Sequence, residues 1–238
     1  MKNSSYIGIS LIILIFGIIF IPRIIDRVQN KDVVESDRLN VKEKDPEKLV
    51  YIEQYEGKKK VPPFEFINQD GDTITNEDYA GKVYVVEFFF TTCPSICPIM
   101  SRNLVTLQEE FKGNDFAIAS FTIDPEHDTP EVLKEYAKNY GVTNPDWHFL
   151  TGDRQKIYEL ANTGFGIYAN EDETVPGGFA HSGLFALIDK EGYVRSRLDQ
   201  HGNPIIYYRG HIDPAKPVSD IEETSQIEIL IEDINNLL

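Results

Sequence analysis

Basic side chains are scarce in this 238-residue sequence, which has 23 lysines and arginines against 39 acidic residues and a formal net charge of -16. A surface of that sign repels phosphate backbones, so we do not expect a nucleic-acid partner. Internal repeats and long low-complexity tracts are absent from the sequence. The hydrophobic content of 41%, with 14 phenylalanines and 12 tyrosines, is ample for a packed core and excludes global disorder.

Cysteine is scarcer still, since the sequence contains only Cys93 and Cys97. They stand four residues apart, after the apolar run VYVVEFFF, and each is followed by a proline. The run predicts a buried strand, and Pro98 suits the first turn of a helix. A helix N-terminus favours thiolate over thiol. This spacing is improbable for two small buried hydrophobic residues, and it indicates a site for thiol redox chemistry or for a soft metal ion.

Long apolar runs are also rare, and the main one spans Tyr6 to Ile21 near the N-terminus. It is close to the length of a membrane-spanning helix, and no small-residue cleavage site or cysteine follows it. We therefore expect residues 1–27 to form an uncleaved signal anchor with one transmembrane helix. Lysine and arginine are balanced on its two sides and do not set its orientation. Residues 28–60 are charge-dense and are expected to form a tether, with a short helix or strand near residues 49–54.

Residues 61–238 show strand patterns alternating with helix patterns, which predicts an α/β domain with a mixed central sheet flanked by helices. A two-thiol turn between the first central strand and a helix is the thioredoxin-like arrangement. Residues 164–178 are expected to form a loop and residues 201–218 an irregular segment. The expected strands are 64–67, 73–75, 83–90, 116–123, 147–150, 179–181, 184–189 and 193–198, and the expected helices are 99–112, 130–140, 154–162 and one around 227–234.

Four segments together resemble the SCO/SenC family in order and spacing: FFFTTCPSICPIM, TIDPEHDTPEVLKEYAKNYG, WHFLTGD and FAHSGLFALIDKEGYVR. The resemblance covers nearly all of residues 61 to 200. It implies a membrane-tethered, thioredoxin-like domain that binds one copper ion through two cysteines and one histidine. Such proteins help to assemble the copper A centre of cytochrome c oxidase. The matching positions are Cys93, Cys97 and His181. The chain departs from the family at His127, where another basic residue is usual, and in its longer tail after Leu198.

Two thiolates and an imidazole make a soft site that suits Cu(I) and accepts Cu(II). A copper chaperone would need His181 as the third ligand, and its expected partners are the copper-bearing subunit of the oxidase and a protein that reduces its thiols. The alternative is a thiol-disulfide oxidoreductase, which needs only Cys93 and Cys97 as a redox-active disulfide pair. A zinc site and a redox sensor remain weaker alternatives, because no general base for hydrolysis and no output domain is visible.

Three further residues have two interpretations each. Asp124 could tune the thiols or simply cap a turn, and His201 and His211 could form a second metal site or be ordinary surface residues. A cycling dithiol suits an oxidising compartment. We therefore expect the globular domain on the outer, periplasmic side of the inner membrane.

Overall fold

The computed structural model describes residues 10, 14–18, 20–22, 49–54, 57–199, 201–214 and 225–238. The chain divides into two compact units, Met1–Lys44 and Asp45–Leu238. In the first unit, residues 14–18 and 20–22 are helical. Among the described residues, no helix has both the length and the apolar character that a membrane span requires. Most of the predicted anchor, and residues 28–48 of the predicted tether, lie outside the described residues.

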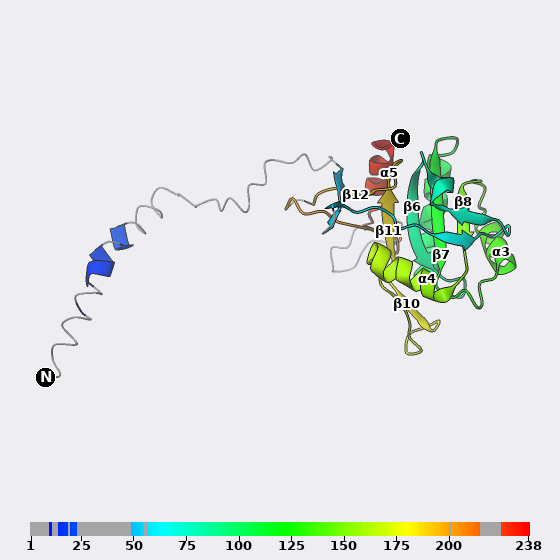
Figure 1. Ribbon diagram of the computed structural model, residues 1–238, viewed down its shortest axis with the longest axis horizontal. Coiled ribbons are helices and arrows are strands. Elements are labelled where there is room, and N and C mark those ends of the chain that lie inside the picture. Colours follow the sequence, from blue (N-terminus) through cyan, green and yellow to red (C-terminus); the bar gives the residue numbers. More distant parts are fainter. Residues whose placement is uncertain are drawn as a thin grey trace. The chain divides into compact units, whose positions relative to one another are not determined.

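The second unit is built on a mixed sheet, as the sequence predicts (Figure 1). Three of its strands are parallel, and those on the other side of β6 are antiparallel. The described strand order is β1 (Val50–Tyr51), β12 (Val194–Ser196), β11 (Leu184–Ile188), β6 (Val83–Phe89), β7 (Phe116–Thr122) and β8 (Trp147–Leu150), with β13 (Tyr208–Arg209) also paired to β11. Strands β6 and β7 are buried along their whole length, which explains their nearly continuous apolar sequences.

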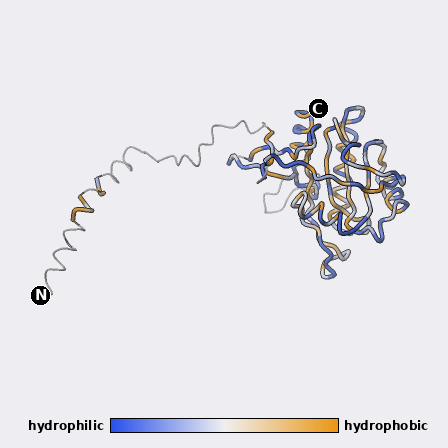
Figure 2. The backbone as a smooth tube through the Cα atoms, viewed as in Figure 1, coloured by the Kyte–Doolittle hydropathy of each residue, from blue (hydrophilic) through white to orange (hydrophobic). Residues whose placement is uncertain are grey.

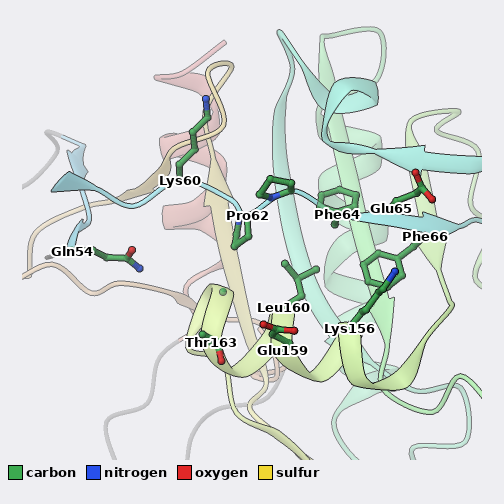
Figure 3. A pocket seen from close by; sticks show the side chains of 12 residues that line it. Gln54, Lys60, Pro62, Phe64, Glu65, Phe66, Lys156, Glu159, Leu160 and Thr163 are labelled. Atoms are coloured by element: carbon green, nitrogen blue, oxygen red, sulfur yellow. The ribbon is translucent and has the colours of Figure 1, made fainter. Parts of the chain in front are cut away.

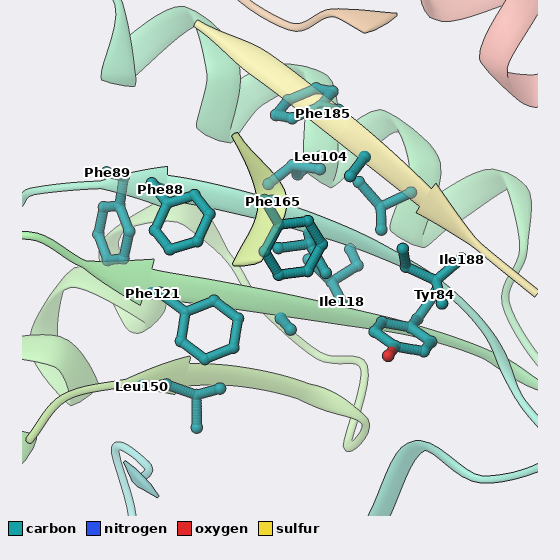
Figure 4. Close-up of a cluster of buried hydrophobic side chains, with 14 of the residues drawn as sticks. Tyr84, Phe88, Phe89, Leu104, Ile118, Phe121, Leu150, Phe165, Phe185 and Ile188 are labelled. Atoms are coloured by element: carbon teal, nitrogen blue, oxygen red, sulfur yellow. The ribbon is translucent and has the colours of Figure 1, made fainter. Parts of the chain in front are cut away.

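Helices cover the two faces of this sheet. Phe89 packs against Tyr136 of α3 (Pro130–Tyr140), with ring centroids 5.4 Å apart. The preceding residue, Phe88, packs against Phe165 of the π-helix η3 (Leu160–Phe165) at 5.8 Å. Because successive side chains of a strand point to opposite faces, α3 and η3 lie on opposite sides of the sheet. Figure 4 shows Phe88, Phe121 and Phe165 in the resulting core, and Figure 2 shows the apolar segments running through the middle of the unit.

Most predicted elements are confirmed with small shifts at their ends. Helix α3 begins after Thr129, whose side chain accepts a hydrogen bond from the Val132 N–H, and it ends at Gly141 with φ 73°. These are the local start and stop signals that the sequence carries. The other predicted elements that are present are the strands β4 (Glu65–Ile67) and β5 (Thr73–Thr75), which form a hairpin, and the helices α2 (Cys97–Glu110), α4 (Arg154–Glu159) and α5 (Ile227–Asn235). The 3-10 helix η2 (Asn76–Tyr79) lies between β5 and β6.

Two expectations need correction. The predicted loop 164–178 contains the end of η3 and the strand β9 (Ala169–Glu171), which pairs with β10 (Phe179–His181) in a separate hairpin. Its residues are mostly polar, because the hairpin has no broad buried face, and so no apolar alternation marks it. The short strand expected near residues 49–54 is present as β1 and β2 (Glu53–Gln54). These strands and β3 (Gly57–Lys58) belong to the globular unit and not to a tether, and β1 pairs with β12.

Candidate metal centre

The structure brings the three predicted ligands together. Cys93 lies in the turn after β6, Cys97 is the first residue of α2, and His181 ends β10. One ligand atom from each residue lies within 4.8 Å of the others, and no other cluster of three or more His, Cys, Asp or Glu ligands occurs in the described part of the chain. His181 Nε2 is 3.2 Å from Cys97 Sγ. Both cysteines are buried free thiols.

The aromatic ring of Phe90 forms one wall of the site. It lies edge-on to the His181 ring with centroids 5.7 Å apart, and it also packs against Phe179. Its backbone carbonyl accepts a hydrogen bond from the Cys93 N–H. Gly177 approaches this wall so closely that a Cβ at that position would lie 2.8 Å from the Phe90 ring. Only glycine fits there, since φ at Gly177 is also 92°.

The two sulfurs differ in protonation. A hydrogen bond from Cys97 lowers the pKa of Cys93 to about 3, with smaller contributions from His181 and from the backbone N–H groups of Cys97 and Ser95. Burial raises the pKa of Cys97 well above its ordinary value, and the neighbouring Cys93 raises it further. These opposite shifts favour the negative charge on Cys93 and the proton on Cys97. A metal ion bound by both sulfurs must displace the proton from Cys97.

A buried carboxylate, Asp128, fixes the turn before Cys93. It accepts hydrogen bonds from the Thr91 N–H (3.1 Å), the Thr91 hydroxyl and the Thr122 hydroxyl (2.5 Å). His127 Nδ1 is 2.8 Å from the same carboxylate, and this hydrogen bond raises the pKa of His127. Asp128 was not among the predicted site residues, because no motif marks it and its contacts with Thr91 form only in the folded protein.

Asp124 makes the contacts of a turn residue. Its N–H donates to Thr122 Oγ1, and its carbonyl accepts from the Asp128 N–H. Burial, followed by the charge of Asp128, raises its pKa. These contacts favour the capping interpretation over a role in tuning the thiols. His211 Nδ1 is 2.9 Å from the Gly183 carbonyl oxygen, and neither His211 nor His201 joins a three-ligand cluster among the described residues.

A second buried carboxyl group, Glu87, was also missed. Glu87 lies on β6 and is fully buried; it accepts a hydrogen bond of 2.7 Å from Ser120, which in turn accepts one from the Trp147 indole. Burial raises the pKa of Glu87 to about 8. Its charge is one of the smaller factors that raise the pKa of Cys97, so the two groups are electrostatically linked. The available signal was a single acidic residue in an otherwise apolar strand.

Comparisons with known proteins find a family model and several relatives that match this chain. The SCO1/SenC family model matches residues 52–210. A SCO1 protein homolog of Bacillus subtilis is 38% identical over 141 residues, covering 56% of this chain and 70% of the relative. The solved structure of BsSco, a Sco-family cytochrome c oxidase assembly protein with a disulfide switch, has 31% identity and a TM-score of 0.60, covering 75% of this chain and 92% of BsSco. Copper-bound ScoI of Arabidopsis thaliana, at 24% identity and a TM-score of 0.55, covers 74% of this chain and 98% of its own and shows the shared fold.

Proposed function

The chain belongs to the SCO1/SenC family, and from that premise we propose that it binds one copper ion through Cys93, Cys97 and His181. The ion would then be delivered to the copper-bearing subunit of cytochrome c oxidase, for assembly of the copper A centre. The observation that carries the proposal is the approach of the three ligand atoms to within 4.8 Å of one another. Related proteins with this fold carry copper or assemble the oxidase.

The donor set fits the proposed cargo. Two sulfurs and one imidazole nitrogen suit Cu(I) and tolerate Cu(II). Cys93 is already a thiolate, so it offers a first ligand without losing a proton. Cys97 gives up its proton as it becomes the second ligand. Three protein ligands leave room for an incoming ligand from a partner, so the ion can pass on by ligand exchange.

Thiol-disulfide exchange is the second candidate function, and the unequal thiols favour it. A thiolate at Cys93 can attack a partner disulfide and form a mixed disulfide. Cys97 then loses its proton and displaces the partner thiolate, which closes a Cys93–Cys97 disulfide and leaves the partner reduced by two electrons. BsSco has a disulfide switch. A separate thiol reductant would return the pair to the dithiol state.

The membrane tether and the location are part of the same proposal. The apolar run from Tyr6 to Ile21 supports an anchor in residues 1–27. A reversible dithiol supports a position of the globular unit on the outer, periplasmic side of the inner membrane.

The test is the copper content of the full-length, reduced protein in detergent, loaded with Cu(I) without oxygen. We expect one copper per chain in the wild type, none retained by Cys93→Ser, and weakened retention by His181→Ala. His201→Ala is the matched control, because His201 is an exposed histidine outside the cluster. Copper retained equally by His181→Ala and His201→Ala would refute the three-ligand site. A copper-free wild type that still exchanges thiols would favour the second function.

A further inference from the structure

The histidine of the site lies on a hairpin that is separate from the central sheet. Strands β9 and β10 form their own two-stranded sheet, in which Ala169 pairs with His181 and Glu171 with Phe179. The cysteines, in contrast, lie at the end of a central strand and the start of a helix. The distance from His181 to the sulfurs therefore depends on what holds this hairpin.

The imidazole itself has little to orient it. Metal-binding histidines usually donate their second ring N–H to a carboxylate or a carbonyl group. Nδ1 of His181 is buried, and within the described residues it has no hydrogen-bond partner. Its ring contacts the Phe90 edge and the Cys97 sulfur. The position of the ring must therefore follow the backbone of the hairpin.

Asn162 holds that backbone directly opposite His181. Its Oδ1 accepts a hydrogen bond from the Ala169 N–H at 3.1 Å, and its Nδ2 donates one to the Ala169 carbonyl at 2.9 Å. Both backbone groups of Ala169 thus point away from β10, as in the non-hydrogen-bonded, closely spaced pair of an antiparallel ladder. The Asn162 amide takes the place of a neighbouring strand. Only a side chain that donates and accepts at once can do this.

Asn162 is itself exposed, and the helix that carries it is held in place at its end. Asn162 lies in η3, and the carbonyl of Phe165 at the end of this helix accepts hydrogen bonds from the buried Lys59 ammonium and the Tyr207 hydroxyl. Burial lowers the pKa of Lys59. Leu160 of the same helix points toward the segment that carries Pro62 (Figure 3), where both residues line a groove. A single π-helical turn is often found next to a functional site.

We propose that Asn162 is a positioning residue of the metal centre, which sets the place of His181 relative to the two thiols by holding Ala169. The inference rests on the proposed function, because it assigns Asn162 to the site that Cys93, Cys97 and His181 form. It adds a contact outside the ligand set, supplied by η3 to the strand β9, which pairs with the strand that carries His181.

The test is a double-mutant cycle on Cu(I) affinity in the full-length protein, with Asn162→Ala, His181→Ala and the double variant. We expect Asn162→Ala to weaken Cu(I) binding about tenfold, the lower end for loss of an outer-sphere contact. In the His181→Ala background the same substitution should have no effect, because its effect passes through the histidine. The matched control is Asn235→Ala. Asn235 Nδ2 donates to Ile231 O at 3.1 Å one turn earlier on α5, just as Asn162 donates to Tyr158 O at 3.1 Å.

Two outcomes would overturn the inference: an Asn162→Ala affinity no weaker than that of Asn235→Ala, or an unchanged tenfold loss in the His181→Ala background. A metal-free measurement keeps the test independent of copper binding. Asn162→Ala should shift the His181 ring resonances in NMR spectra and speed amide exchange across residues 169–182, whereas Asn235→Ala should do neither. If the ring resonances and the amide exchange are unaltered in Asn162→Ala, the positioning role is refuted, even if the wild type binds no copper. If the wild type binds no copper but Asn162→Ala alters the His181 resonances, only the proposed function is refuted.

Discussion

Cys93 and Cys97 lie where the buried strand β6 meets α2, whereas His181 lies on a two-stranded hairpin outside the central sheet. The cysteine turn is tied to the core by the buried Asp128, which bonds Thr91 on one side and Thr122 on the other. The hairpin is tied by Arg154 of α4 to Glu171, by Asn162 of η3 to Ala169, and by the packing of Phe179 on Phe90. The difference indicates that two ligands share the stability of the core, while the third can be altered with little cost to folding.

The largest expected effect concerns Glu87, which lies on β6, the strand that leads to the two cysteines. Its pKa is raised from 4.5 to about 8, so the native state keeps a proton that the unfolded chain has lost between those pH values. The free energy of unfolding should therefore fall as pH rises through this window, by up to about 5 kcal/mol at 1.36 kcal/mol per pH unit. Urea unfolding from pH 5 to pH 8 measures this slope, and Glu87→Gln should flatten it. An equally steep slope in the variant would show that Glu87 is not its source.

The next effect concerns the support of the cysteine turn. Asp128→Ala leaves the partners of a buried carboxylate unsatisfied and should lower the free energy of unfolding by about 3 kcal/mol. Asp115→Ala, at an exposed aspartate, is the control. Chemical denaturation of both variants checks the prediction. If Asp128→Ala lowered the free energy of unfolding no more than an ordinary surface substitution does, the cysteine turn would not be better anchored to the core than the hairpin.

Copper binding should release about one proton, because Cys93 is already a thiolate and Cys97 is not. Between pH 7 and pH 8 the Cu(I) affinity should accordingly rise about tenfold, a change of about 1.4 kcal/mol. Calorimetric titrations in buffers of different ionisation enthalpy count the protons. Two protons per copper, with an affinity that rises about a hundredfold, would mean that both sulfurs start as ordinary thiols.

The smallest effect on folding is expected in the β9–β10 hairpin, which carries His181. Arg154 forms ion pairs with Glu171 of the hairpin and, at 3.0 Å, with Glu126. These groups are partly exposed, so Arg154→Gln should lower the free energy of unfolding by less than about 1 kcal/mol. Amide exchange should nevertheless become faster across residues 169–182. A loss of stability as large as that of Asp128→Ala would mean that the hairpin is part of the cooperative core.

Local signals explain which parts of the fold could be predicted. The strand β6 is marked by its own apolar run, and α3 by Thr129 and Pro130 at its start and Gly141 at its end. Each signal lies within the element or next to it, and both elements are confirmed. Strand β10 was expected, but β9 is short and mostly polar and carries no apolar pattern, so it was predicted to be part of a loop. Strand β9 is recognisable only through contacts with η3, which lies earlier in the chain.

The candidate site divides in the same way. Cys93 and Cys97 stand out by their spacing, whereas His181 was identified only through the family resemblance. Asp128 and Asn162 could not be predicted as supports. Asp128 meets Thr91, 37 residues earlier, only in the folded protein, and the bond from Asn162 to Ala169 matters to the site only because Ala169 pairs with His181. The signal for each lies in three-dimensional hydrogen bonding and not in any motif.

The most direct test of the three-ligand centre is X-ray absorption at the copper edge of the Cu(I)-loaded, full-length protein. Two sulfur scatterers and one nitrogen scatterer are expected, with the nitrogen lost in His181→Ala. A spectrum explained by sulfur alone and unchanged in His181→Ala would contradict the three-ligand centre.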